Sequence, residues 1–354
     1  MKQSLEYQIG KLRISPGLVL APMSGVTCRP FRRLIKELNG DCLGLTVTEF
    51  ISVEALTRNV KRSIEMMRKD ASESPFSIQI FGFDVERMSL AAKMAQDAGA
   101  DTVDINCGCP APKVVRKGGG CELMRQPEHL AGLLKKVRAA ISIPLSLKMR
   151  SGWDESLINA PAIAKVAESE GVDALAVHGR TKTQMYRGES DWNVISNVVE
   201  TVKIPVLGSG DVVDFDSAKQ RLEIGKVAGL MVGRGVLSNP FVFKEICNLG
   251  PLDWRGNDTK ILAVLRRYVE LLKEDVPHTL IPGRIKQLAS GMCRGLSWRK
   301  ALLTTQTLAQ LESLLEDPYS YMSSRNSLDF SRSGEQIQQQ QGQTGALLSS
   351  GTRV

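Results

Sequence analysis

Residues 102–150, TVDINCGCPAPKVVRKGGGCELMRQPEHLAGLLKKVRAAISIPLSLKMR, contain a complete strand–helix–strand pattern. A short run of apolar and β-branched residues (102–108) is followed by a segment of helical periodicity (127–141) and then by a second apolar run (144–150). Short strands that alternate with helices of this length are typical of a parallel sheet covered by helices. The segment therefore predicts one βα unit and the strand of the next.

The same alternation extends from residue 18 to residue 235. Eight strands are predicted, at residues 18–23, 43–50, 76–82, 102–108, 144–150, 174–179, 204–210 and 229–235. Eight βα units match a (β/α)8 TIM barrel better than a doubly wound sheet, which usually has fewer strands. The predicted fold class is α/β, with a TIM barrel followed by a small all-α domain.

The pattern changes after the predicted barrel. Residues 251–317 contain helical runs and no strand pattern, so we expect a helical domain there. From residue 318 the composition turns to Ser, Gln, Gly and Arg, which predicts a disordered tail over 318–354. The predicted organisation is a catalytic barrel at 1–245, the helical domain and the tail.

The composition restricts the class of protein. The chain has 354 residues, 42% of them hydrophobic and 24% charged, as in soluble globular proteins, and no stretch approaches the roughly 20 apolar residues that span a bilayer. Seven cysteines without a Cys-x-x-Cys pair and three histidines argue against structural zinc and a disulfide framework. We expect a cytoplasmic, metal-free monomer without membrane contact. The net charge of +8 favours an anionic partner without requiring one.

Two glycine-containing segments follow the last two predicted strands, Gly208-Ser209-Gly210-Asp211 and Gly233-Arg234-Gly235. The active site of a TIM barrel lies at the C-terminal ends of its strands, and its phosphate site usually follows strands 7 and 8. Glycines there let backbone N–H groups approach an anion. Simple turn chemistry is the alternative for either segment alone, but their joint placement predicts a phosphate cradle.

Three side chains near other predicted strand ends suit a binding pocket, and two of them, Lys148 and Gln79, suit a flavin. Lys148 is costly to bury unpaired, so we expect it to face a negative partner such as a reduced flavin; a solvent-directed lysine and a Schiff-base lysine are the alternatives. Gln79 offers a neutral donor and acceptor to an amide-like flavin edge. His178, beside Arg180, is interpreted as a pocket contact rather than a core histidine.

Cys109 lies between Gly108 and Pro110, ahead of the pliable segment Lys117-Gly118-Gly119-Gly120. A thiol of near-normal pKa is mostly protonated at neutral pH and can donate a proton to a carbon atom. We therefore interpret Cys109 as a general acid that meets the substrate. Cys28, Cys42, Cys247 and Cys293 are interpreted as small buried hydrophobic residues.

These residues belong to a series of motifs. In chain order they are APMSGVTCRPFR (21–32), TEF (48–50), IQIFG (78–82), DINCGCPAPKVVRKGGG (104–120), LKMRSGW (147–153), VHGRTK (177–182), GSGDV (208–212) and GRG (233–235), with a weaker echo in GRIKQLASG (283–291). Together they resemble the tRNA-dihydrouridine synthases of bacterial type. The resemblance covers about residues 15–245.

The resemblance implies an FMN-dependent oxidoreductase with tRNA as its partner and NADPH as its reductant. The implied reaction is the reduction of the C5–C6 bond of specific uridines, with hydride from flavin N5 to C6 and a proton from Cys109 to C5. The implied flavin contacts are Pro22, Met23, Ser24, Gln79, Lys148 and His178, and the implied FMN phosphate contacts are Ser209, Gly210, Asp211, Gly233 and Arg234. Asn106 and Arg150 are implied near the uracil, and Arg180 and Tyr186 near the substrate mouth.

One position departs from the family pattern. Members usually carry Asn-Gly-Asp after strand 7, whereas this chain has Ser209-Gly210-Asp211. The shorter side chain removes one expected contact, while backbone contacts to a phosphate should survive.

Residues 281–300 contain Arg284, Lys286, Arg294, Arg299 and Lys300 and no acidic residue. A solvated helix face is one interpretation of this charge, and contact with a nucleic-acid backbone is the other. The family resemblance favours tRNA binding, so Arg284 and Lys286 are predicted substrate contacts. A uridine in folded tRNA must swing out to reach a site inside a barrel mouth.

Three other functions remain open at this point. A flavin barrel that reduces a free pyrimidine or another small enone would share the phosphate site and the cysteine acid. A Schiff-base aldolase would use Lys148, and a non-catalytic RNA-binding barrel would have no use for a flavin. The extra helical domain and its basic segment argue against the first of these.

Overall fold

The computed structural model describes residues 5–324. The chain divides into two compact units, one ending at Trp254 and the other beginning at Arg255. In the described part of the chain, no helix is both long and apolar enough to cross a membrane.

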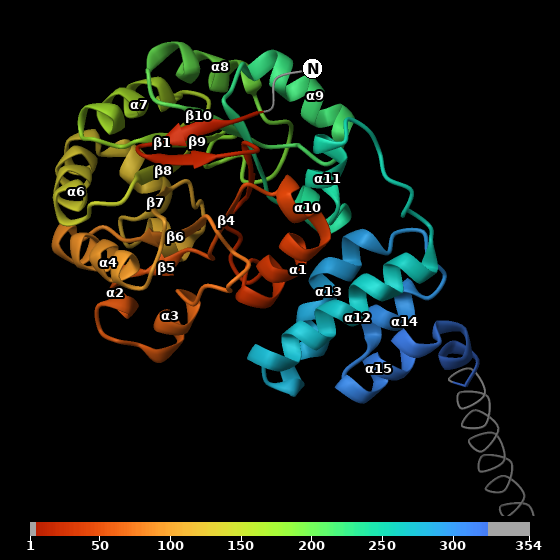
Figure 1. The fold of residues 1–354 in the computed structure, drawn as a ribbon. Helices are drawn as coiled ribbons and strands as arrows, with labels where there is room; N and C mark the ends of the chain where they lie inside the picture. The colour runs from red at the N-terminus through yellow and green to blue at the C-terminus, as the bar shows by residue number, and fades with distance from the viewer. Residues whose placement is uncertain (1–4, 325–354) are drawn as a thin grey trace, which may run out of the picture. The chain divides into compact units, whose positions relative to one another are not determined.

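The first unit is built on a closed parallel barrel, which confirms the predicted fold class. Its strands are β3 (Leu18–Leu20), β4 (Leu45–Val47), β6 (Phe76–Phe81), β7 (Thr102–Cys107), β8 (Leu145–Arg150), β9 (Ala174–His178), β10 (Val206–Ser209) and β11 (Gly229–Val232). Each strand pairs in parallel with the next, and β11 pairs with β3 to close the ring (Figure 1).

The second barrel position differs from the predicted continuous strand at 43–50. It consists of β4, three irregular residues and β5 (Ile51–Ser52), and both strands pair with β6. At the interruption, Thr48 Oγ1 accepts a hydrogen bond from Gln79 N, and the Glu49 side chain accepts one from Gly25 N. Thr48 therefore continues the pairing with β6, and Glu49 holds the loop after β3.

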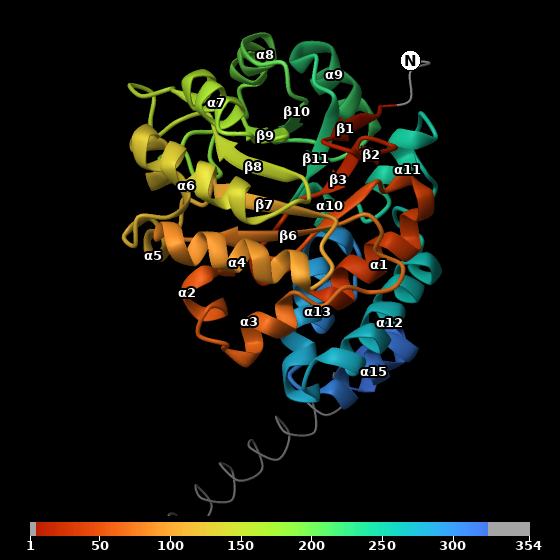
Figure 2. The same ribbon diagram turned by 60° about the vertical axis from the view of Figure 1, so that its left-hand side comes forward.

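Helices surround the barrel, as Figure 2 shows for α4, α6 and α7 outside β6, β7 and β8. Asp84 caps α4 by accepting from Arg87 N, and α4 buries a face of Met88, Ala91, Ala92 and Ala95. The main outer helices are α1 (Arg29–Asn39), α4 (Val85–Asp97), α6 (Pro127–Ala140), α7 (Ala160–Ser169), α8 (Trp192–Thr201) and α9 (Phe215–Gly225). Shorter helices are α2 (Val53–Leu56), α3 (Lys61–Met66), α5 (Pro112–Val115), α10 (Gly235–Ser238) and α11 (Val242–Cys247).

An antiparallel hairpin that the sequence patterns did not predict precedes the barrel. It consists of β1 (Tyr7–Ile9) and β2 (Leu12–Ile14), joined through Gly10 at a φ of 56°. Tyr7 packs against the start of β11, where a Cβ on Gly229 would lie 3.1 Å from the Tyr7 ring and 2.4 Å from the Gly17 carbonyl oxygen. The hairpin therefore covers the N-terminal end of the barrel, away from the predicted site.

The second unit is helical. Its helices are α12 (Asp258–Asp275), α13 (Ile281–Met292), α14 (Arg299–Thr304) and α15 (Leu308–Glu316). The helical run at 298–317 is split, because Thr307 forms a capping box with Gln310 and begins a new helix. Residues 318–324, the start of the predicted tail, are helical, and its remainder at 325–354 lies outside the described residues.

Candidate active site

The loop after β10 requires glycine at one position. Gly210 has a φ of 118°, and a Cβ there would lie 2.2 Å from Ser190 Oγ and 2.9 Å from the His178 ring. Gly233, after β11, is different, because the atom nearest to an added Cβ would be Ala21 Cβ at 3.5 Å. The protein around residue 210 therefore requires glycine. Beside Gly233 there is space, which would allow a ligand to approach the backbone closely.

Four cationic side chains gather around His178. Burial lowers the pKa of His178 well below its usual range, and the charges of Lys148, Arg150, Arg180 and Arg234 lower it further. The imidazole is therefore neutral at pH 7 and offers one donor and one acceptor. Such a concentration of positive charge is suited to a bound anion.

Lys148 is half-buried at the C-terminal half of β8. Burial lowers its pKa to about 8, and Arg150 contributes in the same direction, while Asp104 opposes both. Within residues 5–324 its ammonium group makes no hydrogen bond or ion pair. An anionic ligand would supply the partner that the protein does not.

Asp211 has protein partners for both carboxylate oxygens. Arg180 Nη2 contacts them at 2.8 and 2.9 Å, and Ser190 N donates to Oδ2 at 2.7 Å. Arg234 lies 3.9 Å from the same carboxylate. Asp211 therefore orients Arg180 and Arg234 at the predicted phosphate site. Because its carboxylate is occupied, Asp211 could contact a phosphate only through its backbone.

Arg150 and Arg180 hold the loops of the mouth together. Arg150 Nε donates to the Gly108 carbonyl at 3.0 Å, and its Nη1 donates to the Thr181 and Met185 carbonyls at 2.8 Å each. Arg180 donates to the Arg187 and Gly188 carbonyls as well as to Asp211. Among the described residues, Arg150 Nη2 has no hydrogen-bond acceptor and remains available.

Tyr186 is an exposed aromatic ring between two guanidinium groups. Its centroid lies 5.6 Å from Arg150 Cζ and 4.6 Å from Arg234 Cζ, and 53% of the residue is exposed. Cation–π contact on this scale orients a ring without burying it. Tyr186 therefore presents a flat surface beside the predicted site.

Cys109 is buried on the loop that follows β7. Burial raises the pKa of its thiol, and the Ala111 N–H and the charges of Arg150 and Lys148 offset this only in part. The pliable segment packs closely behind it, since a Cβ on Gly120 would lie 2.5 Å from the Cys109 carbonyl oxygen. The structure thus holds a protonated thiol in a tight loop at the barrel mouth.

The amides of Gln79 and Asn106 are directed at protein groups. Gln79 lies within β6 rather than at its end, and its Oε1 accepts from Asn106 Nδ2 at 2.8 Å. Asn106 Oδ1 accepts from the backbone N–H groups of Gly108 and Cys109 at 3.2 and 2.9 Å. Asp104, which the sequence patterns did not single out, accepts from Gln79 Nε2 at 2.5 Å. The feature of the sequence that could have identified Asp104 is a charged residue inside an apolar strand.

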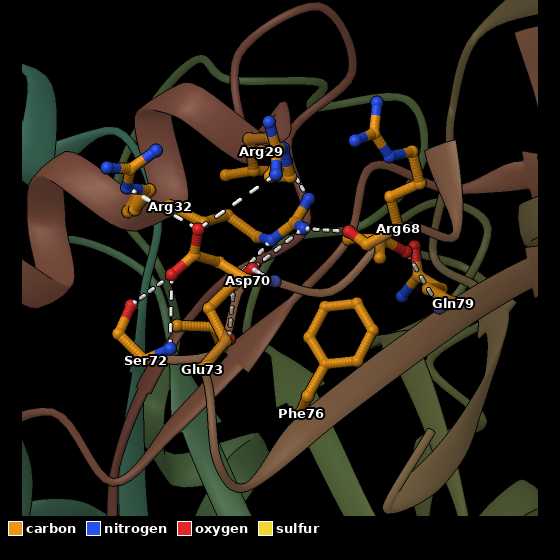
Figure 3. A network of polar contacts seen from close by, with 12 residues as sticks. Arg29, Arg32, Arg68, Asp70, Ser72, Glu73, Phe76 and Gln79 are labelled. Atoms are coloured by element: carbon orange, nitrogen blue, oxygen red, sulfur yellow. Dashed lines mark hydrogen bonds and ion pairs between the residues drawn. The ribbon is translucent and has the colours of Figure 1, made fainter. Parts of the chain in front are cut away.

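The turn that contains Pro22, Met23 and Ser24 is closed by Thr27, whose Oγ1 accepts from Met23 N at 3.0 Å. Behind the turn, Arg32 donates to the Thr27 carbonyl at 3.0 Å and forms a buried ion pair with Glu73 at 2.6 Å (Figure 3). Both partners of this pair are 1% exposed. The sequence patterns missed this clamp, because its residues are 41 positions apart.

Arg284 and Lys286 lie on α13 of the second unit, and both are half-buried. Lys286 Nζ donates to the Thr305 carbonyl at 2.6 Å, at the end of α14. On the same segment, Arg294 and Lys300 are exposed. Lys286 therefore stabilises the helical unit, whereas Arg294 and Lys300 face solvent.

The sequence matches the family model described as dihydrouridine synthase (Dus) over residues 19–320. The chain belongs to the dihydrouridine synthase family. It is 41% identical over 242 residues to a probable tRNA-dihydrouridine synthase of Rickettsia bellii, a match that covers 68% of this chain and 73% of the relative. It is 39% identical over 239 residues to tRNA-dihydrouridine synthase B of Pseudomonas putida, with 68% and 70% covered.

A solved structure supports the fold of this dihydrouridine synthase family member. The complex of 2-naphthoyl-CoA reductase with 2-naphthoyl-CoA superposes with a TM-score of 0.55 at 14% identity, over 71% of this chain and 53% of the other. At this level of identity the likeness concerns the barrel architecture. The thiol and the cationic cluster lie at the end of the barrel where such folds place their active sites.

Proposed function

We propose that the chain reduces the C5–C6 bond of specific uridines in tRNA to give dihydrouridine, with FMN as bound cofactor and NADPH as reductant. The observation that carries the proposal is the buried, protonated Cys109 thiol beside a cationic cluster in a member of this family. The relatives named as tRNA-dihydrouridine synthases support tRNA as the substrate.

The residues around the cationic cluster fit FMN. The backbone after β10 and β11, at Ser209, Gly210, Gly233 and Arg234, would hold the phosphate beside Arg234, with Asp211 orienting the arginines. Lys148, Gln79, His178 and the Pro22-Met23-Ser24 turn would hold the ring system. Reduced FMN supplies the hydride for C6 when it is bound.

Cys109 would donate the proton that C5 needs as hydride arrives at C6. Its raised pKa keeps the thiol protonated through neutral pH, as a general acid requires. Asn106 would hold the loop that carries it, through the Cys109 N–H at 2.9 Å. The two hydrogens added to uracil would therefore come from different donors.

The mouth residues would orient the flipped uridine. Arg150 keeps Nη2 available for a uracil carbonyl, while its other nitrogens fix the loop positions. Arg180 would support this arrangement through Asp211, and the exposed Tyr186 ring would stack on a base. Arg284, Lys286 and the exposed Arg294 and Lys300 of the helical unit would contact the tRNA backbone.

The test compares Cys109→Ala with Cys247→Ala. Cys247, interpreted from the sequence as a buried residue, is exposed in the structure. Both proteins should be yellow, release FMN on denaturation and oxidise NADPH. The Cys109 variant should lose dihydrouridine formation in tRNA by roughly 100-fold or more, the scale of general acid catalysis, and Cys247→Ala should not. Full turnover by Cys109→Ala would remove the acid role. Comparable activity on free uridine would favour a free pyrimidine as substrate, and a colourless protein would exclude the whole proposal.

A further inference from the structure

Asp104 is a buried carboxylate in the interior of the barrel. It is 3% exposed and lies opposite Gln79 on one neighbouring strand and Ser146 on the other. Its Oδ2 accepts from Gln79 Nε2 and its Oδ1 accepts from Ser146 Oγ, both at 2.5 Å. A carboxylate is costly to bury, so its place in a strand core requires an explanation beyond packing.

The contacts of Asp104 begin a series of hydrogen bonds that ends at the backbone N–H of Cys109. Gln79 turns its NH2 group to Asp104, which leaves Oε1 to accept from Asn106 Nδ2 at 2.8 Å. Asn106 then directs Oδ1 at the Gly108 and Cys109 N–H groups. Asp104, Gln79 and Asn106 are each 5% exposed or less, so water does not substitute freely for their hydrogen-bond partners.

The two ends of this series determine its direction. As a carboxylate, Asp104 only accepts at Oδ2, whereas the backbone N–H groups of Gly108 and Cys109 only donate. If the Gln79 amide were reversed, oxygen would face oxygen at Asp104 and the Asn106 NH2 group would have to turn towards the Cys109 N–H. A primary amide at position 104 could present either group, so only the backbone N–H groups at the other end would still enforce this orientation.

Asp104 does not reach the barrel mouth itself. Asp104 lines a small internal cavity together with Tyr7, Ile9, Ser77 and Ser146, on the side of the hairpin that covers the N-terminal end of the barrel. Gln79 and Asn106 therefore lie between Asp104 and the thiol. The influence of Asp104 on the thiol must pass through these two amides, whereas its charge also acts directly on Lys148, whose pKa it raises.

We propose that Asp104 is a positioning residue, whose carboxylate orients Gln79 and Asn106 and thereby holds the Cys109 loop and its thiol in place. The proposal rests on the proposed function for its effect on turnover. Its effect on the thiol is independent of that function.

The test is Asp104→Asn, with Ser77→Ala as the matched control. Ser77 lines the same cavity, and its hydroxyl has no hydrogen-bond partner among the described residues, so the control alters the cavity without touching this series of hydrogen bonds. Asp104→Asn should lower kcat for dihydrouridine formation by about 10-fold to 100-fold and leave the KM for tRNA unchanged, because small misplacements of reacting groups cost this much. Ser77→Ala should keep the wild-type kcat.

A second readout does not depend on activity. Alkylation of Cys109 by iodoacetamide, measured by peptide mass spectrometry against Cys42 in the same protein, should be at least about threefold faster in Asp104→Asn, because a loosened loop exposes the thiol and restores its ordinary acidity. If Asp104→Asn does not fold, Asp104→Ser, which is too short to reach Gln79, takes its place with the same expectations.

Wild-type kcat and wild-type alkylation in a folded Asp104 variant would overturn the positioning role. Absence of dihydrouridine formation by the wild-type enzyme would instead refute the proposed function, and the alkylation comparison would still decide the role of Asp104.

Discussion

Burial sets the protonation of the residues at the barrel mouth. It raises the pKa of the Cys109 thiol and lowers the pKa values of His178 and Lys148. The thiol therefore keeps its proton and the imidazole stays neutral at pH 7, while Lys148 titrates near the physiological range. Cys109 can therefore act as a proton donor and His178 as a neutral hydrogen-bonding group, while the charge of Lys148 depends on pH.

Affinity for FMN should fall as the pH rises through about 8 in the protein stripped of flavin, because Lys148 loses its charge there. Below its pKa the lysine is a cation beside the FMN ring system that adds to the attraction for the phosphate, and above its pKa this contribution is lost. We expect FMN binding, followed by quenching of flavin fluorescence, to weaken about fivefold between pH 7 and pH 9.5, which corresponds to about 1 kcal/mol. Lys148→Met should bind FMN weakly at both pH values, and a Lys148→Met protein with the wild-type pH dependence would contradict this assignment.

The loops after the strands are held by single side chains that reach across the sequence. Arg150 ties the loop after β7 to the loop after β9, and Arg32 ties α1 to the segment before β6. Such contacts fix the positions of the loops at the barrel mouth. Replacing one of these side chains should therefore disturb both of the elements that it connects.

Glu73→Gln should destabilise the barrel unit by about 3 kcal/mol, because it leaves the buried Arg32 guanidinium without its counter-charge. The midpoint of urea-induced unfolding, followed by far-UV circular dichroism, measures the effect. Glu65→Gln is the control, since its ion pair with Lys61 is exposed and contributes at most about 0.5 kcal/mol. Equal midpoints for the two variants would show that the buried pair does not stabilise the unit.

The two glycines after β10 and β11 should respond differently to alanine. Gly210→Ala should destabilise the protein by at least about 2 kcal/mol, because its φ of 118° and the contact at 2.2 Å exclude a Cβ. Gly233→Ala should change stability by less than about 0.5 kcal/mol, since its nearest contact is 3.5 Å, and yet weaken FMN binding. Thermal unfolding and FMN titration separate the two effects. Unchanged FMN affinity in Gly233→Ala would remove the backbone of residue 233 from the phosphate cradle.

The charge of the whole chain, +8, suits an enzyme that acts on a polyanion, and the helical unit carries a basic segment without acidic residues. Lys286, predicted as a tRNA contact, is also bonded to the Thr305 carbonyl, so its replacement would disturb α14. The exposed residues of the same segment offer a cleaner test.

Arg294→Glu with Lys300→Glu should weaken tRNA binding by about 10-fold or more at low salt. It should also flatten the dependence of log K on log salt by about one unit for each phosphate that the helical unit no longer neutralises, while NADPH oxidation is unchanged. Lys203→Glu with Lys219→Glu, on exposed positions of the barrel unit, makes the same change in net charge. Equally weakened binding in both double variants would show that net charge, rather than the helical segment, determines affinity.

The βα alternation between residues 18 and 235 sufficed to predict the barrel, because strand and helix periodicity are local properties of the chain. Placement at strand ends likewise predicted Lys148, His178 and the glycine segments at one end of the barrel. The patterns missed the N-terminal hairpin, whose strands are three residues each, and the break before α15. Elements this short carry too little periodicity to be recognised.

The amino-acid sequence alone determined the class of fold, the end of the barrel that carries chemistry and the choice of Cys109 as the candidate acid. Only the tertiary structure decided which groups are bonded to which: Asp211 to Arg180, Glu73 to Arg32, and Asp104 through Gln79 and Asn106 to Cys109. The physical reason is that hydrogen-bond partners are chosen by the register of strands and loops far apart in the chain, whereas a sequence pattern records only neighbours.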